Sequence, residues 1–131
     1  MQEPKQIRDL NELESSFCSK LVLALDEAHK EGLNPLVYET FRSQERQDFL
    51  YSKGRRGIPG ERKVTWTRSS NHTSRKAADV APQVMKDGRW IIDWNRVDLF
   101  NKLGVIYERF GLTWGGKWKR RDLPHVQDSN L

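Results

Sequence analysis

Two short stretches of the chain each place a histidine close to a carboxylate. His72 is followed by Asp79, and His125 is preceded by Asp122. Two of the 3 histidines of the sequence lie in these two stretches. A catalytic zinc ion typically takes three nitrogen or oxygen ligands from the protein and leaves a fourth position for water. Two imidazoles and one aspartate would complete such a set.

The spacing between His72 and Asp79 matches no face of a helix. Both side chains can therefore reach one ion only if residues 73–76 fold back as a loop. The sequence Ala-Ala-Asp-Val-Ala at 77–81 predicts a short strand, whose alternation puts Asp79 between two alanines on one face. Because these neighbours are small, the carboxylate has room beside it. We therefore predict Asp79 as the third metal ligand, with His72 and His125.

The second stretch contains a proline that argues against a helix carrying both Asp122 and His125. Pro124 lacks an N–H and pushes Leu123 out of the helical region of backbone space. An extended or turn geometry would let Asp122 lie beside the metal without binding it. It would then be within reach of the water that attacks the substrate, as a general base must be. Asp122 is therefore the predicted catalytic base.

These residues resemble a family of zinc cell-wall peptidases of bacteria and phages, which includes L-alanyl-D-glutamate endopeptidases and D-alanyl-D-alanine carboxypeptidases. The family pattern is Ser-x-His, then Gly, Ala and Asp at fixed offsets, and later an acidic residue three positions before a second metal-binding His. The matching residues are Ser70, His72, Ala77, Asp79, Asp122 and His125. The resemblance covers residues 33–127. It departs at Arg75, where the family usually has Gly, and this leaves the path of the loop open.

The resemblance also implies roles for residues outside the two histidine stretches. Arg42 would hold a substrate carbonyl or carboxylate and stabilise the oxyanion, the alternative being an ordinary surface arginine. Ser70 would contact the substrate. Trp114 and Trp118 match the loop that precedes the family's second histidine and would line the substrate groove, although a purely structural role for Trp118 is equally open.

The function implied by the resemblance is that of a zinc-dependent peptidoglycan hydrolase. The expected reaction is cleavage of the L-alanyl-D-glutamate bond of the stem peptide by a phage-type endolysin. Removal of D-alanine by a carboxypeptidase or dipeptidase is the alternative within the same class. Outside that class, the chain could be a basic nucleic-acid-binding module or a zinc-stabilised wall binder without catalysis. No recognised nucleic-acid motif is present, so no specific nucleic-acid partner is expected.

Composition sets limits on these interpretations. A chain of 131 residues is large enough for one core and too short for two ordinary domains, so we expect a single catalytic domain over residues 1–131. Its formal charge of +5 favours binding to polyanions; the alternative is that the charge serves no specific partner. Cys18 is the 1 cysteine of the sequence, which excludes an internal disulfide and a Cys-rich zinc site.

The sequence predicts a protein that does not insert into a membrane. The polar N-terminus contains no uninterrupted apolar segment of the kind found in a secretory signal. The longest apolar run, residues 21–25, is far shorter than the ~20 residues of a membrane span. We therefore expect a monomer made in a host cytoplasm without a signal peptide, which reaches the cell wall after release through a membrane hole made by a holin.

The pattern of apolar residues predicts the elements that must position the site. It indicates an α+β fold, a single small domain in which a short, largely antiparallel sheet packs with helices, as in the hedgehog and D-alanyl-D-alanine peptidase folds that the resemblance implies. A polar loop rich in positive charge is expected at 55–63. The predicted helices span 10–32, 44–53 with Ser43 as its cap, and 96–110 with a cap among 93–95. The predicted strands are 35–41, 77–81, 112–114 and 125–127, with a hairpin over 84–92.

Overall fold

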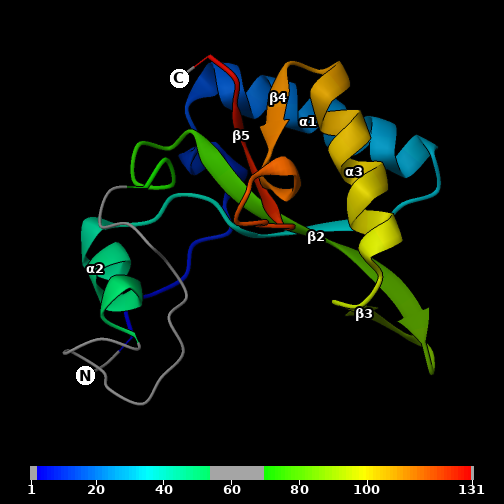
Figure 1. Ribbon diagram of the computed structural model, residues 1–131, viewed down its shortest axis with the longest axis horizontal. Helices are drawn as coiled ribbons and strands as arrows, with labels where there is room; N and C mark the ends of the chain where they lie inside the picture. The colour runs from blue at the N-terminus through cyan, green and yellow to red at the C-terminus, as the bar shows by residue number, and fades with distance from the viewer. Residues whose placement is uncertain (1–2, 54–69, 131) are drawn as a thin grey trace.

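An antiparallel sheet of five strands lies at the centre of the computed structural model, which describes residues 3–53 and 70–130 (Figure 1). Four strands follow the order β1-β2-β5-β4, and β3 pairs with the far end of β2. The strands are β1 (Pro35–Glu39), β2 (Ala77–Lys86), β3 (Arg89–Ile92), β4 (Leu112–Trp114) and β5 (His125–Asp128). The largely antiparallel sheet predicted from the sequence is confirmed.

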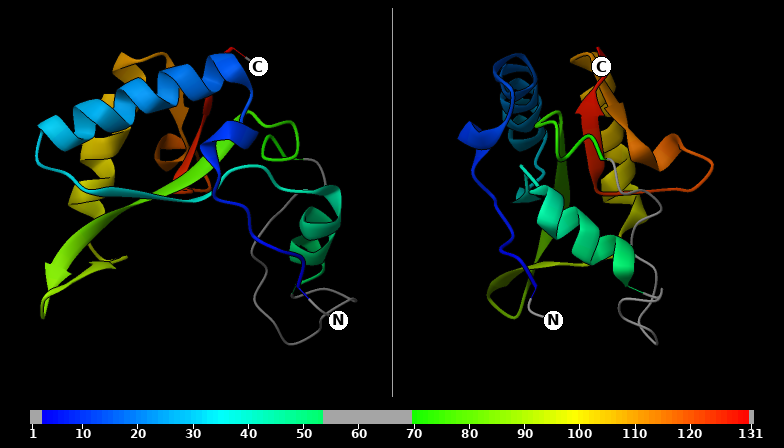
Figure 2. Two further views of the ribbon diagram at one scale, coloured as in Figure 1. Left: turned by 180° about the vertical axis from the view of Figure 1, so that it is seen from behind. Right: turned by 90° about the vertical axis from the view of Figure 1, so that its left-hand side faces the viewer.

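Three α-helices accompany this sheet: α1 (Ser15–Lys30), α2 (Gln44–Ser52) and α3 (Val97–Arg109). Helices α1 and α3 pack against the sheet and against each other, and their buried side chains form one apolar core with those of β2, β4 and β5. Helix α2 lies apart from them at one end of the molecule, beside the N-terminal segment, as Figure 1 and the left view of Figure 2 show. None of the helices in the described ranges is long and apolar enough to cross a membrane.

Strand β2 brings the site together because it pairs with three other strands. Its first six residues, 77–82, are all buried. In the register of the sheet, Asp79 lies opposite Glu39 of β1 on one side and opposite His125 of β5 on the other. An aspartate, a glutamate and a histidine that are far apart in sequence thus become neighbours across the sheet.

Several boundaries differ from those expected. The single helix predicted from Leu10 is divided into a short 3₁₀ helix η1 (Leu10–Glu12) and α1. The division occurs because the Glu14 carboxylate accepts hydrogen bonds from the backbone N–H groups of Ser16 and Phe17 and so caps α1. Helix α3 begins without any side-chain cap, so the cap predicted among residues 93–95 is wrong.

Other local predictions are confirmed. Ser43 caps α2 by accepting a hydrogen bond from the Arg46 N–H. The hairpin between β2 and β3 turns at Asp87 and Gly88, whose φ angles of 52° and 77° are those that an Asp-Gly turn requires. The basic loop predicted at 55–63 lies outside the described residues.

The C-terminal strand is linked to α1 by a partly buried ion pair. Asp128 is 3% exposed, and its Oδ1 accepts a hydrogen bond of 2.8 Å from the Lys20 Nζ. Asp128 therefore belongs to the folded sheet and not to a frayed tail. Burial alone would raise the pKa of Asp128, but the hydrogen bonds from Lys20 and from the Asn130 N–H lower it below its ordinary value.

We expect Lys20→Met to reduce the free energy of unfolding by about 1–2 kcal/mol near neutral pH, because it leaves a buried carboxylate without its cation. The pKa of Asp128 is lowered in the folded state, so the stabilisation exists above the unfolded pKa of about 3.9 and is lost as the pH falls through the folded value. Urea unfolding between neutral and acidic pH, with a chelator present, measures the difference.

The matched control is Lys30→Met on the same helix. Lys30 lies 3.7 Å from Asp26, and both side chains are exposed, so its loss should change stability by less than about 0.5 kcal/mol. Equal effects of the two substitutions, or an effect of Lys20→Met that does not shrink in acid, would contradict the assignment.

Candidate metal centre

The imidazoles of His72 and His125 and the carboxylate of Asp79 converge on one point in the structure. One ligand atom from each residue lies within 4.8 Å of the other two, and all three residues are buried. The Asp79 Oδ1 is 3.4 Å from the His72 Nε2 and 4.0 Å from the His125 Nδ1. A tetrahedral zinc ion holds its ligand atoms ~3.3 Å apart, and the two distances from Asp79 to the imidazoles are close to that value.

The ring orientation of His72 is fixed by the backbone of the segment after β1. Its Nδ1 lies 3.1 Å from the carbonyl oxygen of Thr40, to which it donates its proton. The backbone is bound as well, because the Arg42 N–H donates to the His72 carbonyl. The unprotonated Nε2 therefore points to the cluster, as a metal ligand requires.

The side chains of Gln127 and Asn71 fix the ring orientation of His125. In this ring Nδ1 faces the cluster, whereas in His72 it is Nε2. The His125 Nε2 lies 2.8 Å from the Gln127 Oε1, which also accepts a hydrogen bond of 3.0 Å from the Asn71 Nδ2. Because this oxygen can only accept, the proton of His125 stays on Nε2, and Nδ1 keeps its lone pair for the cluster. Burial and the neighbouring His72 lower the pKa of His125 to about 4, so the ring is neutral at ordinary pH.

The charge of Asp79 is stabilised by its neighbours. Burial favours the neutral acid, but His72, His125 and Arg42 together lower the pKa of Asp79 below its ordinary value. Its second oxygen, Oδ2, lies 3.4 Å from the Arg42 guanidinium. Asp79 is therefore an anion at neutral pH and available to a cation.

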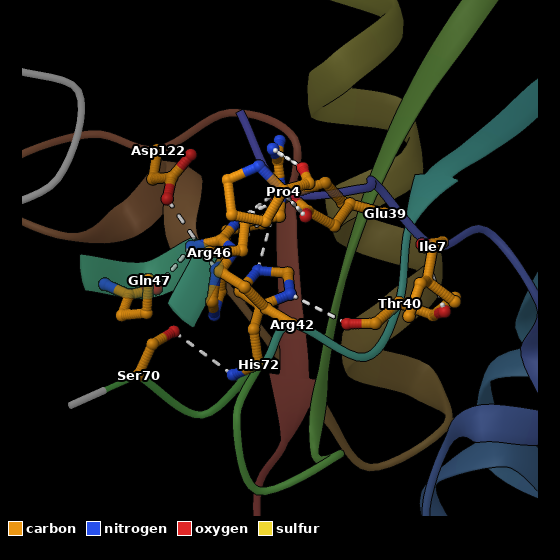
Figure 3. A network of polar contacts seen from close by, with 12 residues as sticks. Pro4, Ile7, Glu39, Thr40, Arg42, Arg46, Gln47, Ser70, His72 and Asp122 are labelled. Carbon is orange, nitrogen blue, oxygen red and sulfur yellow. Dashed lines mark hydrogen bonds and ion pairs between the residues drawn. The ribbon is translucent and has the colours of Figure 1, made fainter. Parts of the chain in front are cut away.

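A buried ionic network surrounds the guanidinium of Arg42, as Figure 3 shows. Glu39 accepts a hydrogen bond of 2.8 Å from Arg42 through Oε1 and is bridged through Oε2 to the Nε of Arg46. Gln47 accepts a second hydrogen bond from Arg42, also of 2.8 Å. Arg42 is 8% exposed, which excludes the alternative prediction of an ordinary surface arginine. Its predicted contact with substrate stays a prediction.

Asp122 lies at the edge of the cluster. Its Oδ2 is 3.7 Å from the His125 Nδ1, while its side chain remains 47% exposed. Burial and the nearby charge of Asp79 raise the pKa of Asp122 to about 6, against smaller opposing effects of His72 and Arg42. A half-exposed carboxyl group with a pKa near neutrality has the properties of a general base.

Gly115 makes the close approach of the loop to the cluster possible. Its carbonyl accepts the backbone N–H of both Trp118 and Asp122, which closes the loop between β4 and β5. A Cβ at this position would lie 2.7 Å from the Asp122 carbonyl oxygen and 3.0 Å from the His125 Cβ. The segment at Gly115 is therefore a tightly packed 3₁₀ helix, η2 (Gly115–Lys117), although two adjacent glycines would also permit flexible backbone.

The three predicted substrate-binding residues occupy different environments. The Ser70 hydroxyl accepts the His72 N–H at 3.1 Å and so supports the turn that carries this ligand. Trp114 is 6% exposed, and its indole N–H donates to the Leu123 carbonyl, which gives it a packing role beneath the loop. Trp118 is 37% exposed, with its ring centroid 4.8 Å from that of His125. Substrate binding stays a prediction for all three, and Trp118 lies nearest to the cluster.

The turn between His72 and Asp79 follows the folded-back path that was predicted. Arg75 adopts the left-handed conformation, with φ of 65°. Glycine adopts this conformation at lower cost, which agrees with the glycine expected here from the family pattern. The Arg75 guanidinium hydrogen-bonds Glu12 at 2.6 Å and lies 3.9 Å above the ring of Phe41. These contacts offset the strain at Arg75.

Sequence reasoning missed the residues that orient the ligands. Gln127 carries an ordinary polar side chain at a strand position, and Thr40 contributes its backbone carbonyl, so neither has a recognisable motif. Glu39 carried a usable signal, because a glutamate in an apolar strand is expected to be exposed or paired. It is 2% exposed and paired with two arginines.

Comparison with known proteins agrees with this geometry. Residues 63–128 match a peptidase family of the M15 group, described as D-alanyl-D-alanine carboxypeptidase. The chain belongs to this peptidase family. The resemblance seen in the sequence is thereby confirmed.

Two curated relatives are named for a specific bond. The chain is 37% identical over 109 residues to the peptidoglycan L-alanyl-D-glutamate endopeptidase CwlK of Bacillus subtilis strain 168, a match that covers 76% of the chain. It is 28% identical over 126 residues to the L-alanyl-D-glutamate peptidase of Listeria phage A118, covering 94% of the chain. The matches span 64% and 40% of the length of these two relatives.

Solved structures share the fold. The L-Ala D-Glu endopeptidase ChiX of Serratia marcescens superposes with a TM-score of 0.68 at 26% identity, covering 90% of this chain and 81% of that one. The vancomycin-resistance D,D-pentapeptidase VanY, solved in complex with Zn(II), superposes with a TM-score of 0.61 at 17% identity, covering 89% and 72%. The α+β architecture predicted from the sequence is therefore the architecture of these peptidases.

We expect Gln127→Leu to weaken zinc binding by about 10–100-fold, because His125 loses the acceptor that fixes its proton on Nε2. Competition with a fluorescent chelator measures the affinity. Ser129→Ala, on the exposed end of the same segment, is the control and should bind zinc as the wild type does. Unchanged affinity in Gln127→Leu, with a preserved fold by circular dichroism, would show that this contact does not orient the ligand.

Proposed function

We propose that the chain is a zinc-dependent peptidoglycan peptidase whose metal is held by His72, Asp79 and His125. The observation that carries the proposal is the convergence of these three side chains, with both imidazole protons directed away from the cluster. When bound there, zinc would supply a Lewis acid for a peptide carbonyl and lower the pKa of water.

Asp122 acts as the general base and then as the general acid. Its carboxylate accepts a proton from the attacking water and returns it to the amine that leaves when the peptide bond breaks. Its position suits both steps, because the half-exposed carboxyl group lies 3.7 Å from the His125 Nδ1, at the edge of the cluster.

Arg42 orients Asp79 and adds positive charge beside the reacting carbonyl. It holds the Asp79 Oδ2 at 3.4 Å, which leaves Oδ1 for the cluster. Its Nε is buried without a hydrogen-bond partner among the described residues, so Arg42 would act on an oxyanion through its charge. This combines the positioning role seen in the contacts with the substrate role predicted from the sequence.

The preferred bond is the one between L-alanine and D-glutamate in the stem peptide. Two curated relatives and one structural neighbour at 26% identity are named for this bond. Release of D-alanine is the second candidate, because the matched family carries the description D-alanyl-D-alanine carboxypeptidase. The biological role we propose is that of a phage endolysin, supported by the similarity to the peptidase of Listeria phage A118.

Purified sacculi should release peptides whose new N-terminus is D-glutamate, and a chelator should abolish the release because the ligands cannot act without their ion. Added zinc should restore it. Mass spectrometry of the products identifies the bond, and release of free D-alanine would instead select the second candidate. Full activity in a strong chelator would contradict a metal-dependent mechanism.

Asp122→Asn should lower kcat by about 10²–10⁴-fold, because the amide cannot accept the proton of water. Zinc affinity should stay within about threefold of the wild type, since Asp122 lies outside the ligand set; inductively coupled plasma analysis and chelator competition measure it. Asp79→Asn is the contrasting variant and should lose zinc. If Asp122→Asn turned over at the wild-type rate, another group would have to be the base.

A further inference from the structure

Trp90 and Trp94 are each 53% exposed, but they differ in how they are held. The Trp94 ring stacks on Phe100 of α3, with centroids 5.8 Å apart and planes inclined by 20°. It also meets the ring of Tyr38 edge to face, at 6.1 Å and 85°. Trp90 makes no such ring contact within the described ranges. Trp94 is therefore a fixed aromatic surface, whereas Trp90 is an exposed side chain on a hairpin.

Tyr38 connects this surface to the metal centre. It lies on β1 directly before Glu39, which is the register partner of Asp79. Burial, followed by the charges of Asp79 and Asp122, raises the pKa of Tyr38 above its ordinary value, so its hydroxyl keeps its proton. Tyr38 lies at the irregularity of β1 between Val37, which pairs with Val80, and Glu39, which pairs with Asp79. Tyr38 and Trp94 thus form an aromatic pair beside the part of the sheet that carries Asp79.

The two flanks of the cluster differ in charge. Strand β1, with Tyr38, lies on one side of β2, whereas β5 and β4 lie on the other. The segment after β4 carries four cations within residues 117–121, and its Trp118 contacts His125. Lys117 of this segment pairs with Glu108 at 2.7 Å, as Arg96 near Trp94 pairs with Asp98 at 3.0 Å, but the segment carries three further cations. One flank suits an anionic part of a substrate, and the flank of Trp94 suits an uncharged part.

We propose that Tyr38 and Trp94 form a subsite for the sugar backbone of peptidoglycan. This inference rests on the proposed function. In peptidoglycan the L-alanine nitrogen is joined to the lactyl group of a muramyl sugar, so the sugar begins one residue from the scissile bond. Pyranose rings present apolar C–H faces that stack on an indole, and their hydroxyl and acetamido oxygens accept hydrogen bonds from a phenol. The carboxylate-bearing part of the stem peptide then runs towards residues 117–121.

The test compares two substrates with the same stem tetrapeptide, one carrying its N-acetylglucosaminyl-N-acetylmuramyl disaccharide and one without sugar. Trp94→Ala should lower kcat/KM for the sugar-bearing substrate by about tenfold, mainly through KM, and leave the bare peptide within about twofold. Trp90→Ala is the matched control, with the same exposure, and should leave both values unchanged. Trp94→Leu keeps an apolar cover on Phe100 and should behave as Trp94→Ala does.

Equal losses on both substrates would assign Trp94 to the peptide or to the fold and overturn the sugar subsite. No loss in the Trp94 variants, or the same loss in Trp90→Ala, would overturn it too. If the wild type cleaves neither substrate, the proposed function fails, and binding of a chitin tetrasaccharide, followed by tryptophan fluorescence, tests the subsite separately. Binding that weakens in Trp94→Ala but not in Trp90→Ala supports the subsite; equal or absent binding in all three proteins refutes it.

Discussion

The buried charge of Asp79 is the constraint on which the rest of the site depends. An ionised carboxylate that is 8% exposed is costly unless positive or polar groups surround it. The Arg42 guanidinium does so on one side and is itself held by Glu39. The rings of His72 and His125, held by Thr40 and Gln127, turn their unprotonated nitrogens towards the other side. A cation at the centre would complete this arrangement, because it supplies the charge that neutral imidazoles cannot.

The sheet imposes this arrangement through its register. Asp79 can lie between Glu39 and His125 only because β2 pairs with β1 and with β5 at the same residue. A shift of either pairing by one residue would turn the partner side chain to the other face of the sheet. The apolar core formed by α1, α3 and the strands holds this register, so the packing of the core also fixes the geometry of the site.

The three residues that converge in the cluster could be singled out from the sequence because their motifs are local. His72 and Asp79 share one turn and strand, and Asp122 and His125 share one short segment. The fold class followed from the order of apolar patterns. The orienting residues could not be predicted in this way, because Gln127 and Asn71 are 56 positions apart and meet only through the pairing of β5 with β2. The start of α1 and the cap of α3 were also predicted wrongly: the Glu14 side chain caps α1 after η1, and α3 begins without a side-chain cap.

The same distinction separates Arg42 from the three residues of the cluster. Its position after β1 was evident from the sequence, but its burial against Glu39 and Gln47 depends on how α2 turns back on the strand. A residue expected to face the substrate is thus also a support for Asp79. Trp114 similarly supports the loop that carries Asp122, through the hydrogen bond from its indole N–H to the Leu123 carbonyl.

A crystal structure of the zinc-loaded protein, with anomalous data at the zinc edge, tests the central claim most directly. The account predicts one zinc peak about 2.0–2.2 Å from the His72 Nε2, an Asp79 carboxylate oxygen and the His125 Nδ1. Zinc bound elsewhere, or His72, Asp79 and His125 directed to separate places in the metal-loaded protein, would contradict it.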